Sequence, residues 1–170
     1  IAMFDALGQV DKIVGVSGID YVSNPYILAH KNSIKDMGPE MNYELLLGLK
    51  PDVVLLYGIG DAQTAVTDKL KELFIPYMYV GEYLEESPLG KAEWLVALAE
   101  LTDSREKAIE IFREIPKRYQ VLKALTESVE QRPTVMLNTP WNDSWVMPST
   151  QSYMAQLVTD AGADYIYKKN

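Results

Sequence analysis

The chain has 170 residues, is 48% hydrophobic and carries a formal net charge of −8 from 16 basic and 24 acidic side chains. This length can bury a core but is small for two complete domains, so we expect one domain and part of a second. Apart from the terminal Lys168-Lys169 no basic cluster occurs, which excludes the electrostatic footprint of a nucleic-acid-binding protein.

Composition also excludes several kinds of site and segment. The chain has no cysteine, so disulfides, thiolate metal sites and cysteine nucleophiles are excluded, while the redox compartment stays open. No run approaches the length of about 18 apolar residues that a membrane-spanning helix requires. No basic and then apolar leader opens the sequence, although a processed N-terminus would look the same.

The first predicted elements are a short helix over Ile1–Leu7, ended by Gly8, and a strand over Ile13–Val16 within Lys12–Ser17. We expect another strand of the same sheet to be missing before this one. The next clear signal is a helix after Asn42, whose side chain can cap the following turn and whose residues Leu45 and Leu49 face a core.

A corner and a strand follow this helix. Lys50 precedes a proline and is therefore pushed out of the helical region, so the helix must stop there. Asp52–Tyr57 is then a continuous apolar run, which is typical of a strand inside a parallel sheet. A helix near Ala62–Phe74 and a strand at Tyr77–Val80 continue the alternation, which predicts βαβ units and the fold class α/β with a Rossmann-like N-terminal lobe.

Helices dominate the next part of the chain. Leu89–Leu101 is amphipathic, and Asp103 with Glu106 resembles a capping box that starts a second helix running to about Ser128. Pro116 lies inside this long helix and should kink it. We interpret the long helix as a connector between two lobes.

The βα pattern resumes with a strand over Thr134–Leu137 and a helix over Ser152–Ala161 that ends at Gly162. This pattern indicates the start of a second α/β lobe. The predicted organisation is therefore an N-terminal lobe over residues 1–85, a helical connector over 86–130 and the beginning of a truncated C-terminal lobe over 131–170.

Three candidate chemical sites have simple structural explanations. His30 is the only histidine, so a site built from several histidines is excluded and a helix-flank role is favoured. Gly58-Ile59-Gly60 follows a strand as a phosphate-binding loop would, but Gln63 replaces the third glycine of a dinucleotide fingerprint. Glu82, Glu85 and Glu86 could be paired carboxylates, yet acids before a helix are also favoured by its dipole.

Aromatic and polar residues gather where predicted strands end. In open α/β sheets the loops at the carboxyl ends of the strands form the ligand crevice, and rings with a few polar atoms suit a large, partly apolar ligand. Some of these rings could instead seal loops against the core. The candidate ligand-binding residues are Tyr21, Tyr57, Gly58, Glu82, Tyr83, Trp141, Asn142 and Trp145.

Several segments together resemble one protein class, the substrate-binding proteins of ABC importers that have two α/β lobes joined by one long helix and handle cobalamin, haem and ferric siderophores. The matching segments are Leu7-Gly8, Ile13-Val14-Gly15, Glu44 with Leu49-Lys50-Pro51-Asp52-Val53-Val54, Gly90-Lys91-Ala92-Glu93 with the break at Thr102-Asp103, Pro133-Thr134-Val135 and Ala161-Gly162. The Leu-Lys-Pro-Asp segment is the most specific of them. Members of the class have a complete second lobe, so we expect this chain to be a fragment or processed product.

The resemblance implies a function without catalysis and without an intrinsic cofactor. It implies a periplasmic or lipid-anchored protein that delivers a ferric siderophore, haem or cobalamin to an ABC permease, with Glu44 presented to arginines of that permease. The second-lobe glutamate of the class cannot be assigned in this chain. Alternatively, Glu44 could have no role other than to stabilise the positive end of its helix dipole. Two other functions stay open at this point: an α/β enzyme that binds a nucleotide or phosphate at Gly58-Ile59-Gly60, and an interaction module without a ligand.

Overall fold

The structure, a computed structural model, describes residues 1–58 and 63–167 and divides into two compact units, Ile1–Gly81 and Glu82–Asn170. These are called unit 1 and unit 2. The boundary falls at the end of a strand and before a helical segment. The finer division into two lobes and a connector stays a prediction.

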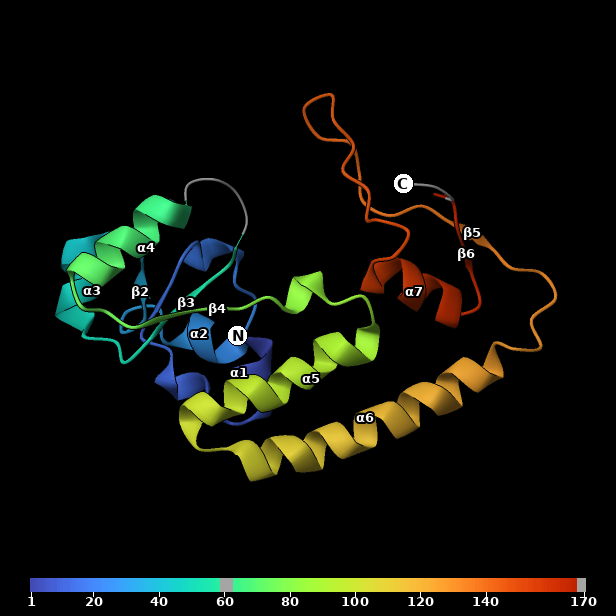
Figure 1. Cartoon of the computed structure of the whole chain (residues 1–170), viewed down its shortest axis with the longest axis horizontal. Coiled ribbons are helices and arrows are strands. Elements are labelled where there is room, and N and C mark those ends of the chain that lie inside the picture. Colours follow the sequence, from blue (N-terminus) through green and yellow to red (C-terminus); the bar gives the residue numbers. More distant parts are fainter. Residues whose placement is uncertain (59–62, 168–170) are drawn as a thin grey trace. The chain divides into compact units, whose positions relative to one another are not determined.

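Unit 1 alternates short helices and strands, as the sequence pattern predicts (Figure 1). Its elements in chain order are α1 (Ala2–Ala6), a 3-10 turn (Val10–Lys12), β1 (Gly15–Val16), a 3-10 turn (Ile19–Tyr21), α2 (Pro25–Ala29), β2 (Lys35–Asp36), α3 (Tyr43–Leu49), β3 (Val54–Leu56), α4 (Gln63–Glu72) and β4 (Tyr77–Tyr79). Strand β1 pairs with β2 and strand β3 pairs with β4, both in parallel. The α/β class and the parallel strands are therefore confirmed.

Helix α3 forms for the predicted reason. The side chain of Asn42 accepts a 3.0 Å hydrogen bond from the backbone N–H of Leu45, which satisfies a donor that the helix start leaves free. The helix ends at Lys50, which has a φ of 49° and so leaves the right-handed helical region before Pro51. The following strand covers only Val54–Leu56, which is shorter than the predicted run.

Among the described residues, two apolar clusters contribute to the core of unit 1. One gathers around Val10, Ile19, Ile27 and Ile34 and fixes the segments on either side of β1. The other lies between the strand pair β3–β4 and helices α3 and α4, and its buried members are Met37, Leu46, Leu56 and Leu70. Because Ile19 is buried in the first cluster, the 3-10 turn that follows β1 is held firmly against the core.

Unit 2 joins a helical segment to one βαβ unit. Its elements are a 3-10 turn (Glu82–Leu84), α5 (Pro88–Ala99), a 3-10 turn (Glu100–Thr102), α6 (Arg105–Leu125), β5 (Thr134–Val135), α7 (Tyr153–Asp160) and β6 (Asp164–Tyr165). Strand β5 pairs in parallel with β6, and α7 connects them. The predicted long helix is confirmed as α6, and β5 with α7 matches the predicted start of a further α/β segment.

Two local predictions are wrong. Asp103 does not cap the long helix: it has a φ of 51°, and Ser104 is the residue before α6. The Ser104 hydroxyl lies 2.7 Å from the Thr102 hydroxyl and 3.4 Å from the Ala99 carbonyl. It therefore hydrogen-bonds to the end of α5 and does not cap α6. The first strand is also shorter than predicted: β1 contains only Gly15–Val16, and the Ile13 N–H closes the preceding 3-10 turn by bonding to the Val10 carbonyl.

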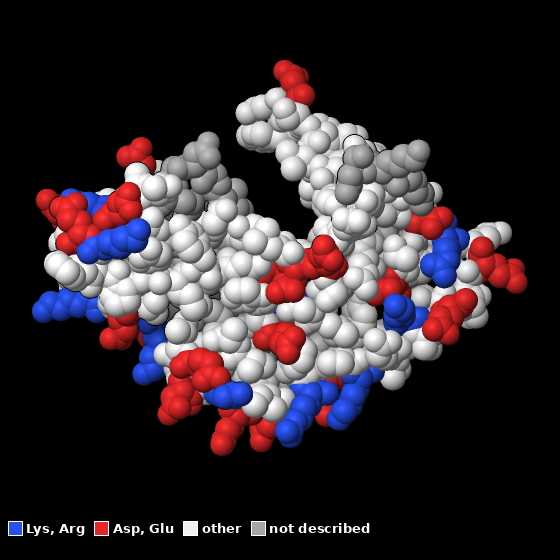
Figure 2. All heavy atoms as spheres, viewed as in Figure 1, with Lys and Arg blue, Asp and Glu red and all other residues white. Residues whose placement is uncertain are grey.

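Helix α6 continues through Pro116 as one element of 21 residues. Acidic and basic side chains are interspersed along it in Figure 2, and the ion pair between Lys117 and Glu114 measures 2.7 Å. Such exposed pairs contribute little stability but keep the helix surface hydrated. Within residues 1–58 and 63–167, none of the helices combines the length and the apolar character that crossing a membrane demands.

Candidate functional site

Tyr21 is the most exposed of the predicted ligand-contacting residues in unit 1, with 95% of its surface accessible. It ends the 3-10 turn that follows β1, and its neighbour Ile19 anchors this turn in the core. The ring lies close against Gly18: a Cβ placed on Gly18 would be 3.1 Å from Tyr21 Cδ2. Gly18 has a φ of 70°, a conformation that glycine adopts readily, so the backbone under the ring depends on this glycine.

Asp36, at the end of β2, holds the same loop and was missed by sequence reasoning. Its Oδ1 atom accepts hydrogen bonds of 3.0 Å from the backbone N–H groups of Gly18 and Gly38. The bond from Gly38, followed by smaller contributions from Gly18, Ile19 and the charge of Lys31, lowers the pKa of Asp36 below its ordinary value of 3.8. An aspartate two residues before a glycine is a known turn signal and could have suggested the Gly38 contact. The Gly18 contact needs the pairing of β1 with β2.

Tyr57 and Gly58 follow β3, where the sequence places a second ligand-contacting segment. Half of the Tyr57 surface is accessible and Gly58 is exposed. The other two residues of the proposed phosphate-binding turn, Ile59 and Gly60, lie outside the described residues. Tyr21 and Tyr57 thus emerge from two separate strand ends of unit 1.

Glu44 lies in the first turn of α3, and its side chain is exposed. The cap of this turn is already provided by Asn42, whose side chain accepts from the Leu45 N–H. A carboxylate here stabilises the positive end of the helix dipole by about 0.3 to 1 kcal/mol. The position is also accessible to a partner, so both interpretations of Glu44 remain compatible with the structure.

In unit 2, Glu82 is buried, with 7% of its surface accessible, and Lys91 Nζ lies 3.5 Å from its Oε1 atom. The same ammonium group stands 4.5 Å from the centre of the Tyr153 ring, so Lys91 of α5 contacts both the 3-10 turn and the start of α7. Tyr83, in the same turn, is half-buried. The role of Glu82 and Tyr83 in binding a ligand stays a prediction.

Trp141 and Asn142 lie together on the long loop that follows β5. Trp141 and Ser144 exchange two backbone hydrogen bonds of 2.8 and 3.0 Å, and the two residues between them, Asn142 and Asp143, have φ values of 45° and 58°. This is the pattern of a tight hairpin turn, for which Asn and Asp are suited because they tolerate positive φ. The turn leaves 78% of the Trp141 surface accessible.

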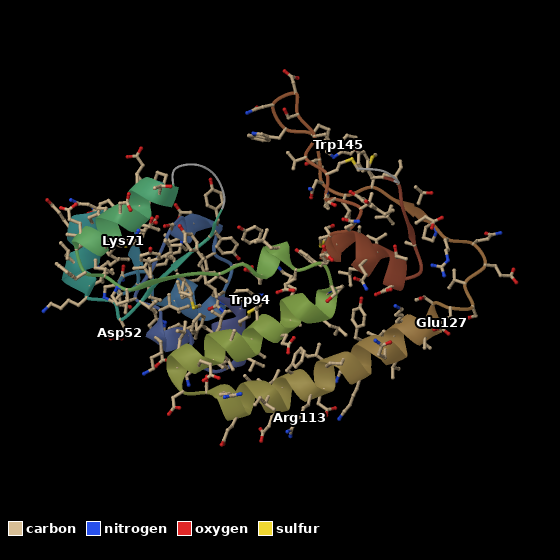
Figure 3. The ribbon with its side chains drawn as sticks, in the orientation of Figure 1. Asp52, Lys71, Trp94, Arg113, Glu127 and Trp145 are labelled. Atoms are coloured by element: carbon tan, nitrogen blue, oxygen red, sulfur yellow. The ribbon has the colours of Figure 1, made fainter. Side chains whose placement is uncertain are left out.

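Trp145 closes the base of this loop and is less exposed than Trp141. Its indole N–H donates a 3.2 Å hydrogen bond to the Leu137 carbonyl, and 40% of its surface is accessible. The amide of Asn138 donates a 2.8 Å hydrogen bond to the Val146 carbonyl beside it. Figure 3 shows Trp145 on this loop, while Trp94 lies on α5, where its indole N–H donates to Glu85.

An open hollow of about 550 Å³ lies within this loop. An aromatic face, amide groups and hydroxyl groups line it, which allows ring stacking and hydrogen bonding to the same ligand. Sequence reasoning did not single out Asn138, Thr139 or Val146, although Asn138 before Thr-Pro is a turn signal. The lining residues are Asn138, Thr139, Trp141, Asn142, Ser144 and Val146.

His30, the only histidine, has a structural role. It follows α2, its ring stacks on that of Tyr26 at 4.1 Å, and its Nδ1 donates to the Tyr26 carbonyl at 2.8 Å. This agrees with the predicted helix-flank position. Across residues 1–58 and 63–167, no group of three or more His, Asp or Glu side chains is arranged to hold a metal ion.

The sequence profile of the periplasmic binding proteins matches residues 1–170. The chain belongs to this family. The assignment agrees with the α/β class, the parallel strands and the long helix described above. It also confirms the family resemblance found in the sequence segments.

A relative from Methanocaldococcus jannaschii, named an uncharacterized lipoprotein, is 26% identical over 181 aligned positions. The alignment covers 99% of this chain and 43% of the relative. The chain therefore spans less than half the length of this relative.

Several solved structures share the fold, and two of them illustrate the likeness. The periplasmic heme-binding protein HutB of Vibrio cholerae superposes with a TM-score of 0.74 at 17% identity, covering 96% of this chain and 61% of HutB. The periplasmic vitamin B12-binding protein BtuF of the same organism gives a TM-score of 0.70 at 18% identity, covering 99% of this chain and 62% of BtuF. At these identities the likeness shows the fold alone.

Proposed function

We propose that this chain is part of an extracytoplasmic substrate-binding protein that captures a metal chelate and delivers it to an ABC permease without chemical turnover. The observation that carries the proposal is the family membership of the whole chain, combined with exposed rings on strand-end loops of each unit. The cargo is one of three related kinds: haem, a corrinoid such as cobalamin, or a ferric siderophore. Heme and vitamin B12 are the ligands named for HutB and BtuF, two of the structures that share the fold.

Ring contact is the main source of affinity in this proposal. Trp141 offers an open indole face, and Asn142 and Ser144 offer hydrogen-bonding groups next to it. A large aromatic side chain buries much apolar area when a ligand covers it, at a low cost in conformational entropy. A flat chelate with polar edges matches this combination.

Tyr21 supplies a second kind of contact. Its phenol oxygen is a hard donor of the type that ferric iron prefers, and its ring can stack on a macrocycle. The exposed ring of Tyr57 is suited to stacking. Bound metal is cargo in this scheme, since it arrives and leaves inside its chelator.

Glu44 is the proposed contact to the permease. An exposed carboxylate can orient the protein on a basic membrane-protein surface and raise the association rate, an effect that salt weakens. We propose a periplasmic or lipid-anchored location for the same protein. The lipoprotein name of the methanogen relative supports this location.

The test is a titration of the natural full-length protein, and of residues 1–170 for comparison, with hemin, cyanocobalamin and a set of ferric siderophores. Quenching of tryptophan fluorescence reports binding, and the absorbance of hemin or cobalamin gives an independent signal. We expect one class of chelate to bind saturably with one molecule per protein. If the full-length protein binds none of the three classes, the proposal is wrong.

A further inference from the structure

The loop that carries Tyr21 is fixed from below by a residue of the neighbouring strand. Val16 of β1 is opposite Asp36 of β2 in the parallel register, so the carboxylate of Asp36 reaches the backbone just beyond β1. There it accepts the Gly18 N–H at 3.0 Å, and the same oxygen accepts the Gly38 N–H. One oxygen atom therefore ties the loops after β1 and β2 together.

Gly18 transmits this constraint to the Tyr21 ring. It holds a left-handed conformation with φ 70° and ψ 55°, and its carbonyl accepts the Tyr21 N–H at 3.0 Å. The Tyr21 ring lies so close to Gly18 that a Cβ there would approach Tyr21 Cδ2 to 3.1 Å. The position of the ring thus depends on the backbone of Gly18, and that backbone depends on Asp36.

The other charged groups of the loop do not share this arrangement. Asp20, which precedes Tyr21, extends into solvent and forms an ion pair of 3.3 Å with Lys31. Such an exposed pair contributes little to conformation. Asp20 and Asp36 are therefore a natural comparison, since one carboxylate is bound to the backbone under the ring and the other is paired at the surface.

We propose that Asp36 is a positioning residue for ligand capture, and that it acts by fixing Gly18 and thereby the exposed ring of Tyr21. This inference rests on the proposed function, because it takes Tyr21 as a ligand contact. A charged acceptor bound to two backbone donors is a strong, directional restraint. Its loss leaves the ring mobile, so the ligand must order the ring when it binds.

The experiment compares Asp36→Ala, Asp36→Asn and Asp20→Asn with wild type, using whichever of hemin, cyanocobalamin or ferric siderophore the full-length protein binds. We expect Asp36→Ala to weaken affinity about tenfold, which corresponds to about 1.4 kcal/mol. Asp36→Asn keeps one acceptor oxygen and should recover most of the affinity. Asp20→Asn should stay within about twofold of wild type.

Two further measurements separate positioning from a general loss of structure. In a Tyr21→Ala background, Asp36→Ala should cause almost no additional loss of affinity, whereas independent roles would give additive losses. Fluorine NMR of tyrosine-labelled protein, with Tyr21 assigned by the Tyr21→Phe variant, reports the order of the ring without any ligand. We expect its signal to shift and change in width in Asp36→Ala and to be unchanged in Asp20→Asn.

An unchanged Tyr21 signal in Asp36→Ala, or additive losses in the double variant, would overturn the positioning role. Failure of wild type to bind any chelate would instead contradict the proposed function, and the fluorine measurement would still decide whether Asp36 positions the ring. Denaturant unfolding of each variant identifies any that fail to fold. If Asp36→Ala fails to fold, Asp36→Glu takes its place, because it keeps the charge but moves the carboxylate away from the Gly18 N–H. The Tyr21 signal should then shift, and an unchanged signal would overturn the positioning role.

Discussion

The hydroxyl of Tyr119, in the second half of α6, donates a 2.7 Å hydrogen bond to Asp160 Oδ2 at the end of α7, 41 positions further along the chain. Lys123, one turn further along α6, places its ammonium 2.8 Å from the other oxygen of the same carboxylate. The Asp160 side chain is mostly buried, which strengthens both contacts, while 40% of the Lys123 side chain stays accessible. This junction fixes the βαβ segment of unit 2 to the long helix.

Removal of the Tyr119 hydroxyl should weaken this junction. We expect Tyr119→Phe to lower the free energy of unfolding by about 1 kcal/mol, because Asp160 loses one hydrogen bond but keeps Lys123. Denaturant unfolding followed by circular dichroism measures the change. Tyr79→Phe, at a more exposed tyrosine of β4, is the control and should have little effect. Equal losses in the two variants would show that the Tyr119 hydroxyl has no special role.

The same carboxylate predicts a loss of stability in acid. Burial alone would raise the pKa of Asp160, but the hydrogen bonds from Lys123 and Tyr119 outweigh it and hold the pKa below its ordinary value of 3.8. A carboxyl group with a lowered pKa in the folded state stabilises the protein above its unfolded pKa, and this contribution is lost as the pH falls through the folded pKa. Below about pH 4, the Tm of wild type should therefore fall more steeply with decreasing pH than the Tm of Asp160→Asn. Parallel curves would exclude this contribution.

Gly162 provides a test of the turn between α7 and β6. It has a φ of 81°, and a Cβ at this position would lie 2.8 Å from Thr126 Cβ. We expect Gly162→Ala to cost at least about 1 kcal/mol of stability, since an L-residue is strained in this conformation and the methyl group also meets a side chain. Gly48→Ala is the matched control, because Gly48 lies in α3 with open space around it. Alanine there should be neutral or stabilise the helix by about 0.5 to 1 kcal/mol.

If Glu44 contacts the permease, a substitution of Glu44 should reduce transport and leave the affinity for the ligand unchanged. In the full-length protein, Glu44→Lys should slow uptake of the cargo and the association with its permease, while the affinity for the chelate stays unchanged. Reconstituted uptake and a ligand titration measure the two quantities. Glu110→Lys on α6 makes the same charge change at another exposed position and should leave uptake normal. Normal uptake by Glu44→Lys would leave this glutamate with its helix-dipole role only.

Ring contact predicts the effect of truncating Trp141. We expect Trp141→Ala to reduce affinity for the chelate about tenfold, with little change in stability, because the indole is largely exposed in the free protein. Leu125→Ala, at an exposed apolar residue of α6, should leave affinity unchanged. Isothermal titration gives both affinities. Undiminished affinity in Trp141→Ala would show that the loop hollow is not part of the binding surface.

Local signals allowed much of the fold to be predicted. Asn42 caps its helix as expected, and Gly162 ends α7 in a left-handed conformation. Each of these outcomes depends on residues within one helical turn. The α/β class followed from their order along the chain.

Predictions failed or were missing where distant segments decide the structure. Asp103 and Glu106 have the spacing of a capping box, but Ser104 is drawn to the end of α5 instead. Asp36 gains its role only when β2 pairs with β1 and brings Gly18 within reach. In the candidate site, Trp141 was predicted to contact a ligand from its residue type and position, and this stays a prediction. The hydrogen bond that holds Trp145 depends on a loop path that the sequence pattern does not specify.

The hydrogen bonds across the base of the loop that carries Trp141 affect how long a bound ligand would stay. Trp145 bound to the Leu137 carbonyl and Asn138 bound to the Val146 carbonyl hold the two sides of the loop together before any ligand arrives. A pre-organised loop saves the ordering entropy of each side chain it holds, about 0.5 to 1.5 kcal/mol, and this saving mainly slows dissociation. In the proposed function the protein must keep its cargo during diffusion, and a loop that is already ordered favours a long residence time.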